Sequence, residues 1–124
     1  MRLLAIDFGE RYIGIALSDE QGIIAYPYTM IERTSDREAL TEIKKICQDK
    51  GVKRIILGYP ATPGKRESPI QHRILSFFRK LKKLKIEAIL YDERWTTKIA
   101  SHLTDQMIDA RAAAIMLSEY LEKP

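Results

Sequence analysis

The chain has 124 residues, and its 21 Lys and Arg residues against 17 Asp and Glu residues give a net charge of +4. This length and composition predict a single globular domain, residues 1–124, rather than a disordered chain. The single cysteine, Cys47, excludes an internal disulfide framework and a cysteine-based zinc cluster. Because no segment reads as a leader or as a bilayer span of about 20 apolar residues, we expect a cytoplasmic protein without membrane contact.

The first third of the chain predicts three strands joined by short turns. The apolar run 3–6 ends at Asp7, and a turn over residues 8–11 leads into a second strand over residues 12–17. A third strand is expected over residues 23–31, with Pro27 at an edge or a bulge. Short connections of this kind indicate an antiparallel three-strand meander.

The rest of the chain alternates between helical and extended patterns. Ser35 and Ser68 are expected to begin helices, and Gly51 is expected to end the first of them. The other predicted elements are strands over 54–58 and 86–91, a short helix over 98–106 and a final helix over 109–122. Helices between the later strands imply parallel pairing, so the sequence predicts an α/β fold with a mixed five-stranded sheet flanked by helices. Cys47 falls on the apolar side of the first helix and is expected in the core.

Three acidic residues lie where predicted elements begin or end. Asp7 ends the first strand, Glu93 follows the last strand, and Asp109 begins the final helix. Ligands of α/β proteins gather at the carboxyl ends of parallel strands, so these side chains would meet if the first and last strands were neighbours. Three adjacent carboxylates require a cation between them, and oxygen ligands favour Mg²⁺ or Mn²⁺, which can support phosphodiester hydrolysis.

Each carboxylate also has a simpler interpretation. An aspartate at a strand end, such as Asp7, often forms a turn, and Asp109 is a good N-cap. Glu93 could pair with Arg94 in the same loop. The metal-site hypothesis therefore depends on all three positions together.

Four motifs, in order along nearly the whole chain, resemble those of the YqgF family, which comprises Holliday junction resolvase-like proteins also described as pre-16S rRNA nucleases. They are Asp7-Phe8-Gly9 followed by Ile13-Gly14-Ile15-Ala16, Leu57-Gly58-Tyr59-Pro60, Asp92-Glu93-Arg94-Trp95-Thr96-Thr97, and Asp109 followed by Ala112-Ala113. The resemblance implies a ribonuclease H-like fold in which Asp7, Glu93 and Asp109 are the catalytic, metal-binding residues. The segment before Asp109 is shorter than is usual in the family.

The implied activity is metal-dependent endonucleolytic cleavage of nucleic acid with Mg²⁺ or Mn²⁺, chiefly at the 5′ end of precursor 16S rRNA within ribosomal precursor particles. Cleavage of branched DNA and binding without catalysis are the alternatives. The candidate substrate-binding residues are Arg11, Lys65, Arg66, Arg94, Thr96 and Thr97.

The densest cationic run lies in residues 79–85, where Arg79, Lys80, Lys82, Lys83 and Lys85 have no acidic residue among them. Such a run can follow a row of phosphates. It can equally be a solvated helix end whose cations complement the helix dipole. The sequence leaves both interpretations open.

Overall fold

The computed structural model describes residues 1–9, 11–60, 68–92 and 105–123, and for residues 105–109 it describes the backbone only. The strands are β1 (Arg2–Phe8), β2 (Tyr12–Ser18), β3 (Ala25–Glu32), β4 (Val52–Tyr59) and β5 (Glu87–Asp92). The helices are α1 (Asp36–Lys50), α2 (Pro69–Leu81), the 3₁₀ turn η1 (Lys82–Leu84) and α4 (Asp105–Glu122). Within these residues, no helix combines the length and apolar character that a bilayer crossing requires.

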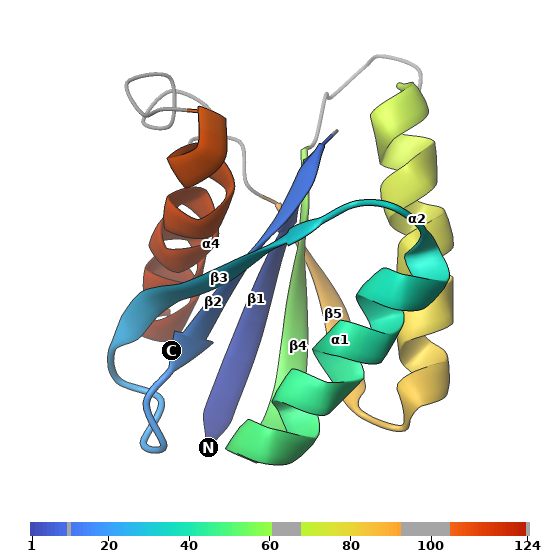
Figure 1. Cartoon of the computed structure of the whole chain (residues 1–124). Helices are drawn as coiled ribbons and strands as arrows, with labels where there is room; N and C mark the ends of the chain where they lie inside the picture. Colours follow the sequence, from blue (N-terminus) through green and yellow to red (C-terminus); the bar gives the residue numbers. More distant parts are fainter. Residues whose placement is uncertain (10, 61–67, 93–104, 124) are drawn as a thin grey trace.

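The strands form one mixed sheet in the order β3-β2-β1-β4-β5 (Figure 1). β1, β2 and β3 pair antiparallel, and β4 pairs parallel with both β1 and β5, which confirms the predicted meander and parallel strands. The first and last strands are not neighbours, because β4 lies between them. Since β1, β4 and β5 are all parallel, their carboxyl ends still meet at one edge of the sheet.

One face of the sheet packs against α1 and α2 (Figure 1). The alternate residues Leu4, Ile6 and Phe8 of β1 point into this core, as do Ile55 and Leu57 of β4. α1 contributes Ile43 and Cys47, and α2 contributes Ile74, Phe77 and Leu81. Cys47 is 2% exposed, which confirms its predicted place in the core.

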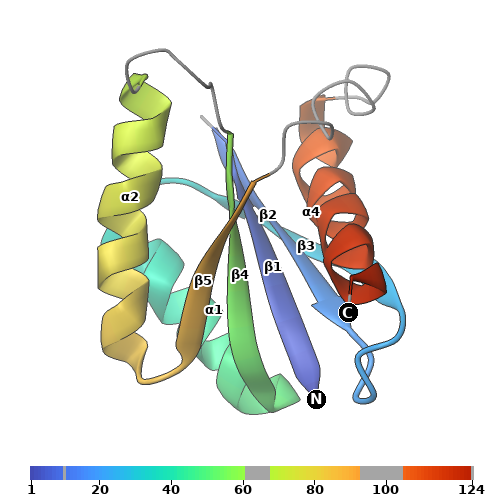
Figure 2. The same ribbon diagram turned by 180° about the vertical axis from the view of Figure 1, so that it is seen from behind.

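The opposite face packs against α4, as the view from behind shows (Figure 2). Leu3 and Ala5 of β1 and Ile56 of β4 meet Ala113 and Met116 of the helix. The small side chains of α4 allow a close approach to the sheet. Helices on both faces therefore cover the buried central strands.

Local signals explain where α1 and α2 begin. The Ser35 side chain accepts a hydrogen bond from the backbone N–H of Glu38, and Gly51 ends α1 in the left-handed conformation with φ of 67°. Ser68 caps α2 and Pro69 follows it, as predicted. Gln71 completes a capping box with Ser68.

Several strand ends differ from the prediction by one or two residues, and two differences have a clear structural reason. β3 begins at Ala25 rather than Ile23, because the Asp19 carboxylate accepts hydrogen bonds from the backbone N–H groups of Ile23 and Ile24, at 2.7 and 3.0 Å, and holds them in a loop. α4 begins at Asp105, so Asp109 lies one turn inside the helix and not at its start. No break separates residue 106 from residue 109, while residues 98–104 of the predicted short helix lie outside the described residues.

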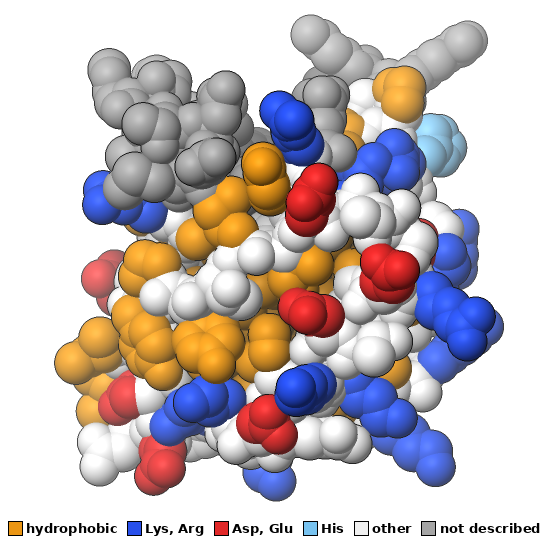
Figure 3. Space-filling model, in the orientation of Figure 1, with side chains coloured by type: hydrophobic (Ala, Val, Ile, Leu, Met, Phe, Trp, Pro, Cys, Tyr) orange, Lys and Arg blue, Asp and Glu red, His pale blue; other side chains and the backbone are white. Residues whose placement is uncertain are grey.

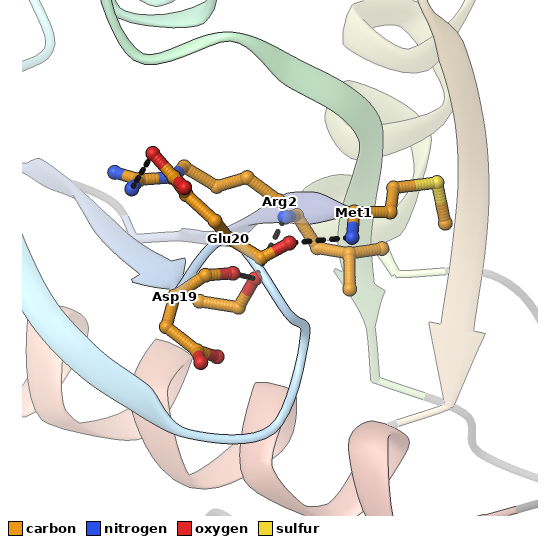
Figure 4. Close-up of polar contacts among 6 residues, drawn as sticks. Met1, Arg2, Asp19 and Glu20 are labelled. Atoms are coloured by element: carbon orange, nitrogen blue, oxygen red, sulfur yellow. Dashed lines mark hydrogen bonds and ion pairs between the residues drawn. The ribbon is translucent and has the colours of Figure 1, made fainter.

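The N-terminal end of β1 is tied to the loop that follows β2 (Figure 4). The Met1 ammonium donates a hydrogen bond to the carbonyl oxygen of Glu20, and Arg2 pairs with the Glu20 carboxylate at 3.7 Å. The backbone N–H of Leu3 donates to the buried hydroxyl of Ser18 over 2.8 Å. These contacts lie at the end of β1 opposite Asp7, so they fix the strand without occupying the edge where Asp7 lies.

Candidate active site

Asp7 is half-buried near the carboxyl end of the central strand β1. Side chains alternate along a strand, and Leu3 and Ala5 belong to the core beneath α4, so Asp7 lies on the α4 face. Phe8, which follows Asp7, is still part of β1, so the strand runs one residue further than predicted. The pairing with β2 therefore fixes the backbone on both sides of Asp7.

Glycines lie beside Asp7 on both neighbouring strands. Gly14 of β2 is directly opposite Asp7 in the antiparallel register. On β4, Gly58 comes directly after Leu57, which pairs with Ile6. Both glycines share the α4 face with Asp7, because Ala16 and Ile56, two residues away from them, lie in that core. No neighbouring side chain on these two strands crowds the Asp7 carboxylate, which suits a residue that a ligand approaches closely.

The ends of β4 and β5 lie at the same edge as Asp7. Gly58 pairs with Tyr91, and Tyr59 pairs with Asp92, the last residue of β5. α4 begins at this end of the sheet, as both ribbon views show (Figures 1 and 2). The ends of β1, β4 and β5 and the beginning of α4 therefore all lie at this edge of the sheet.

The predicted triad is only partly described. Asp7 is the one member whose side chain the structure describes, since Glu93 lies outside the described residues and Asp109 is placed through its backbone. Asp109 lies three and four residues before Ala112 and Ala113, which are buried against the sheet. Within the described side chains, no group of three or more His, Cys, Asp or Glu residues could hold a metal ion.

Among the predicted substrate contacts, Arg11 is exposed in the turn between β1 and β2, close in sequence to Asp7. The others lie outside the described residues: Lys65, Arg66, Arg94, Thr96 and Thr97.

Arg33 is a residue at this edge that sequence reasoning missed. Its guanidinium donates a hydrogen bond to the carbonyl oxygen of Gly9 over 2.8 Å and lies over the Phe8 ring, 4.9 Å from the ring centroid. Its backbone N–H donates to the carbonyl oxygen of Arg11 over 3.0 Å. Arg33 thus fastens the turn that follows Asp7. No local sequence pattern signals this role, because the antiparallel register, which pairs Tyr12 with Glu32, is what brings Arg33 to the turn.

Gln71 joins the end of β4 to the beginning of α2. This buried side chain, 3% exposed, accepts a hydrogen bond from the backbone N–H of Ser68 over 2.6 Å. Its amide also donates to the carbonyl oxygen of Pro60, the residue after β4. The first turn of α2 is therefore anchored at the edge that holds Asp7.

A separate cavity of about 730 Å³ opens between β3 and the beginning of α1. Its lining includes the carboxylates Glu32, Glu38 and Glu42 and a single cation, Arg37. Asp7 is not part of it. A phosphate group would be repelled by this lining, so the cavity does not compete with the Asp7 edge as a nucleic-acid site.

The fold resembles those of enzymes that act on branched DNA. It matches Thermus thermophilus RuvC in complex with a Holliday junction substrate with a TM-score of 0.64 and 10% identity, covering 98% of this chain and 93% of that one. It matches the fowlpox virus resolvase in complex with Holliday junction DNA with a TM-score of 0.56 and 12% identity, covering 99% and 100%. At such identities the likeness establishes the fold alone, and it is ribonuclease H-like.

Sequence similarity identifies the family of the chain, which the likeness of fold does not. Residues 1–123 match the family model described as "RuvX: Holliday junction resolvase". A protein of Desulforudis audaxviator named "Putative pre-16S rRNA nuclease" is 36% identical over 132 residues, covering 98% of this chain and 94% of its own. A protein of the same name from Carboxydothermus hydrogenoformans is also 36% identical, with coverages of 98% and 96%.

The fold defines an α/β protein of the ribonuclease H type. The chain belongs to the RuvX family, also called YqgF, of Holliday junction resolvases. This confirms the resemblance found in the sequence motifs. The family and the names of the relatives agree on an enzyme that hydrolyses phosphodiester bonds of nucleic acid.

Proposed function

We propose that this protein cleaves precursor 16S rRNA near its 5′ end during ribosome maturation. One observation carries the proposal: Asp7 lies half-buried and flanked by glycines at the carboxyl edge of the sheet. The near full-length similarity to relatives named for pre-16S rRNA supports the choice of substrate. Ribosomal precursor particles and the cytoplasm are the corresponding proposed partner and location.

We propose Asp7, Glu93 and Asp109 as the carboxylates that hold Mg²⁺ or Mn²⁺. The chemistry of the donors supports this, because oxygen ligands suit these ions, and the residues beside Asp7 on the two neighbouring strands are glycines. The spacing of Asp109 from Ala112 and Ala113 also supports it, since residues three and four apart share one face of a helix. When bound, such ions activate a water molecule and stabilise the leaving oxygen of the phosphodiester.

The protein's own residues position the reaction. The pairing of β1 with β2 and β4 holds Asp7, and Arg33 holds the turn that follows it. The exposed guanidinium of Arg11 is available to bind a phosphate of the substrate. We assign substrate contacts also to Lys65, Arg66, Arg94, Thr96 and Thr97, because they occur in or near the family motifs.

Cleavage of branched DNA is the second candidate. The description of the matched family, Holliday junction resolvase, favours it. Both candidates use the same phosphodiester chemistry at the same edge, so they differ in substrate and not in mechanism.

The test is cleavage of three labelled substrates, a precursor 16S rRNA fragment, an unrelated single-stranded RNA and a four-way DNA junction, with Mg²⁺, Mn²⁺ or EDTA. We expect metal-dependent cleavage at a defined site of the precursor rRNA. Asp7→Asn should reduce the rate at least roughly a hundred-fold, because removing a charged group that acts on the transition state costs about 3 kcal/mol or more. Asp49→Asn, the same change on an exposed residue of α1, is the matched control.

If only the four-way junction is cleaved, the substrate is branched DNA and not precursor rRNA. Equal cleavage by wild type and Asp7→Asn would show that a contaminating nuclease is responsible. If the protein binds precursor rRNA but does not cleave it with either metal ion, it is a non-catalytic binding protein.

A further inference from the structure

The positive charge of the chain has one source. The segment that comprises α2, η1 and Lys85, residues 69–85, holds six Lys and Arg residues and no Asp or Glu. Outside this segment, 15 Lys and Arg residues face 17 Asp and Glu residues. The net positive charge therefore comes from a single helix and its C-terminal extension, and Lys and Arg side chains gather at the edge of the molecule over α2 and α1 (Figure 3).

The cations of this segment are exposed along its outer side. Ile74, Phe77 and Leu81 bury the inner side of α2 against the sheet. Arg73, Arg79 and Lys83 are exposed, and we call these three residues the α2 stripe. Ten residues separate the first from the last, which is roughly 15 Å along a helix. Arg73 and Arg79 are six residues apart and therefore point about 120° apart around the helix, so a nucleic-acid strand that meets all three residues would cross α2 obliquely.

Two other cations of the segment already have partners. Lys80 pairs with Asp36 of α1 at 2.8 Å, and the Lys82 ammonium lies 4.6 Å from the centroid of the Phe78 ring. Within the part of the chain that the structure describes, the stripe residues have no carboxylate partner of this kind. The stripe and the exposed Lys85 are therefore the part of the basic segment that is available to an external polyanion.

The stripe begins at the edge of the candidate active site. Gln71 ties the first turn of α2 to Pro60, directly after β4, and β4 lies beside β1, which carries Asp7. From there α2 runs along the sheet to its opposite end (Figure 1). Asp7 lies on the α4 face and α2 covers the other face, so a strand bound at Asp7 would pass over the end of the sheet to reach α2, which carries no acidic side chain.

We propose that the α2 stripe binds the sugar–phosphate backbone of the nucleic-acid strand leading away from the cleavage site. This inference rests on the proposed nuclease function for its substrate, but it concerns binding and not the chemical step. The contacts are to phosphates, so the stripe contributes affinity without base specificity. The proposal adopts the phosphate-binding interpretation of the cationic run, which the following experiment tests.

The experiment measures binding of a short labelled single-stranded RNA by fluorescence anisotropy in EDTA, over a series of salt concentrations from about 50 to 400 mM. The test variant is R73Q/R79Q/K83Q, which removes the charges and retains residues that favour helix. The matched control, K45Q/K50Q/K53Q, removes three exposed cations from the end of α1 and the start of β4. Circular dichroism and thermal unfolding establish that both variants fold, and the single variant R79E serves as a second test.

We expect the test variant to lower the slope of log affinity against log salt by about 2, because each phosphate contact contributes about 0.7 for a single strand. Its dissociation constant at about 100 mM salt should rise at least roughly ten-fold. R79E should also weaken binding. The control variant K45Q/K50Q/K53Q should change the slope by less than half as much as the test variant does.

Unchanged binding by the test variant, an equal loss in the control, or no RNA binding by the wild type would each overturn the inference. The proposed function has a separate readout, because cleavage requires added metal and is tested with Asp7→Asn. The test variant could lose RNA binding while the wild type shows no cleavage. That result would support RNA binding by the stripe and reject the nuclease proposal.

Discussion

The guanidinium of Arg33 donates a hydrogen bond to the carbonyl oxygen of Gly9 over 2.8 Å. The two residues are 24 positions apart, and the contact closes the turn between β1 and β2 two residues after Asp7. Arg33 also stacks on Phe8, whose ring packs at 5.2 Å from that of Phe77 in α2. The position of the turn therefore depends on packing across the sheet face.

Arg33→Met is expected to lower the free energy of unfolding by about 1–2 kcal/mol, because a charge-assisted hydrogen bond and a cation–π contact are lost. The cleavage rate should fall further than this loss of stability explains, since the turn next to Asp7 loses its anchor. Urea unfolding and cleavage kinetics check the two effects. Arg37→Met, on an exposed residue of α1, is the control, and equal effects in both variants would refute the positioning role.

Gly14→Ala is expected to reduce metal-dependent cleavage roughly ten-fold or more while the protein remains folded. The new methyl group lies directly opposite Asp7 on the same face, where paired Cβ atoms are about 5 Å apart. Its backbone is compatible with alanine, since among the described residues only Gly22 and Gly51 have positive φ as glycines. Titration with Mn²⁺ should show weaker binding. Full activity in this variant would mean that the space beside Asp7 is not used.

Gln71→Ala is expected to destabilise the protein by about 1–3 kcal/mol, because it leaves partly buried backbone groups of Ser68 and Pro60 without their partner. Gln71→Glu retains an acceptor for Ser68 but places a buried carboxylate against the carbonyl oxygen of Pro60, so it should destabilise the protein at least as much as Gln71→Ala. Chemical denaturation measures both. Equal stability of Gln71→Ala and the wild type would show that the link between β4 and α2 contributes nothing.

Burial raises the pKa of the Cys47 thiol to about 11. The thiol is therefore neutral at pH 8, and its reaction with a disulfide reagent should be much slower in the folded protein than in urea. The reagent releases a coloured thiolate for each thiol that reacts. Because Cys47 is the only cysteine, the absorbance of this product measures the reaction of Cys47 alone. Rapid labelling without denaturant would contradict its place in the core.

Backbone hydrogen bonds from Ile24 and Ile23 lower the pKa of Asp19 below its usual value. Since the folded-state pKa is the lower one, the loop is stabilised when Asp19 is ionised, and this stabilisation is lost as the pH falls through the lowered pKa. An NMR titration of the Asp19 carboxyl group should show the shift. In Asp19→Asn, the amide signals of residues 23 and 24 should no longer change over that acidic range.

Local signals made the helix starts of α1 and α2 predictable, because Ser35 and Ser68 carry the capping information within three residues. The start of α4 was missed because Asp105 and Asp109 can both begin a helix, and no glycine or proline lies between them to decide. Ile23 and Ile24 suggested a strand, but a carboxylate four and five residues earlier competes for their backbone.

The candidate site was predictable in part. The position of Asp7 at a strand end follows from its apolar run, and this is confirmed. The placement of β4 between β1 and β5 depends on contacts between distant segments, so no local pattern reveals it. The same holds for Arg33, whose partner Gly9 is brought near only by the sheet register. The meeting of Asp7 with Glu93 and Asp109 stays a prediction.

Pro27 lies in β3, the outermost strand of the sheet at the meander side, where the register shifts between Ile15 and Ala16. A proline has no N–H, so β3 has no backbone donor at this position to offer another strand. Two copies of the chain are thereby discouraged from joining edge to edge into a continuous sheet. An exposed proline on an edge strand thus opposes the edge-to-edge pairing by which sheets extend into fibrils.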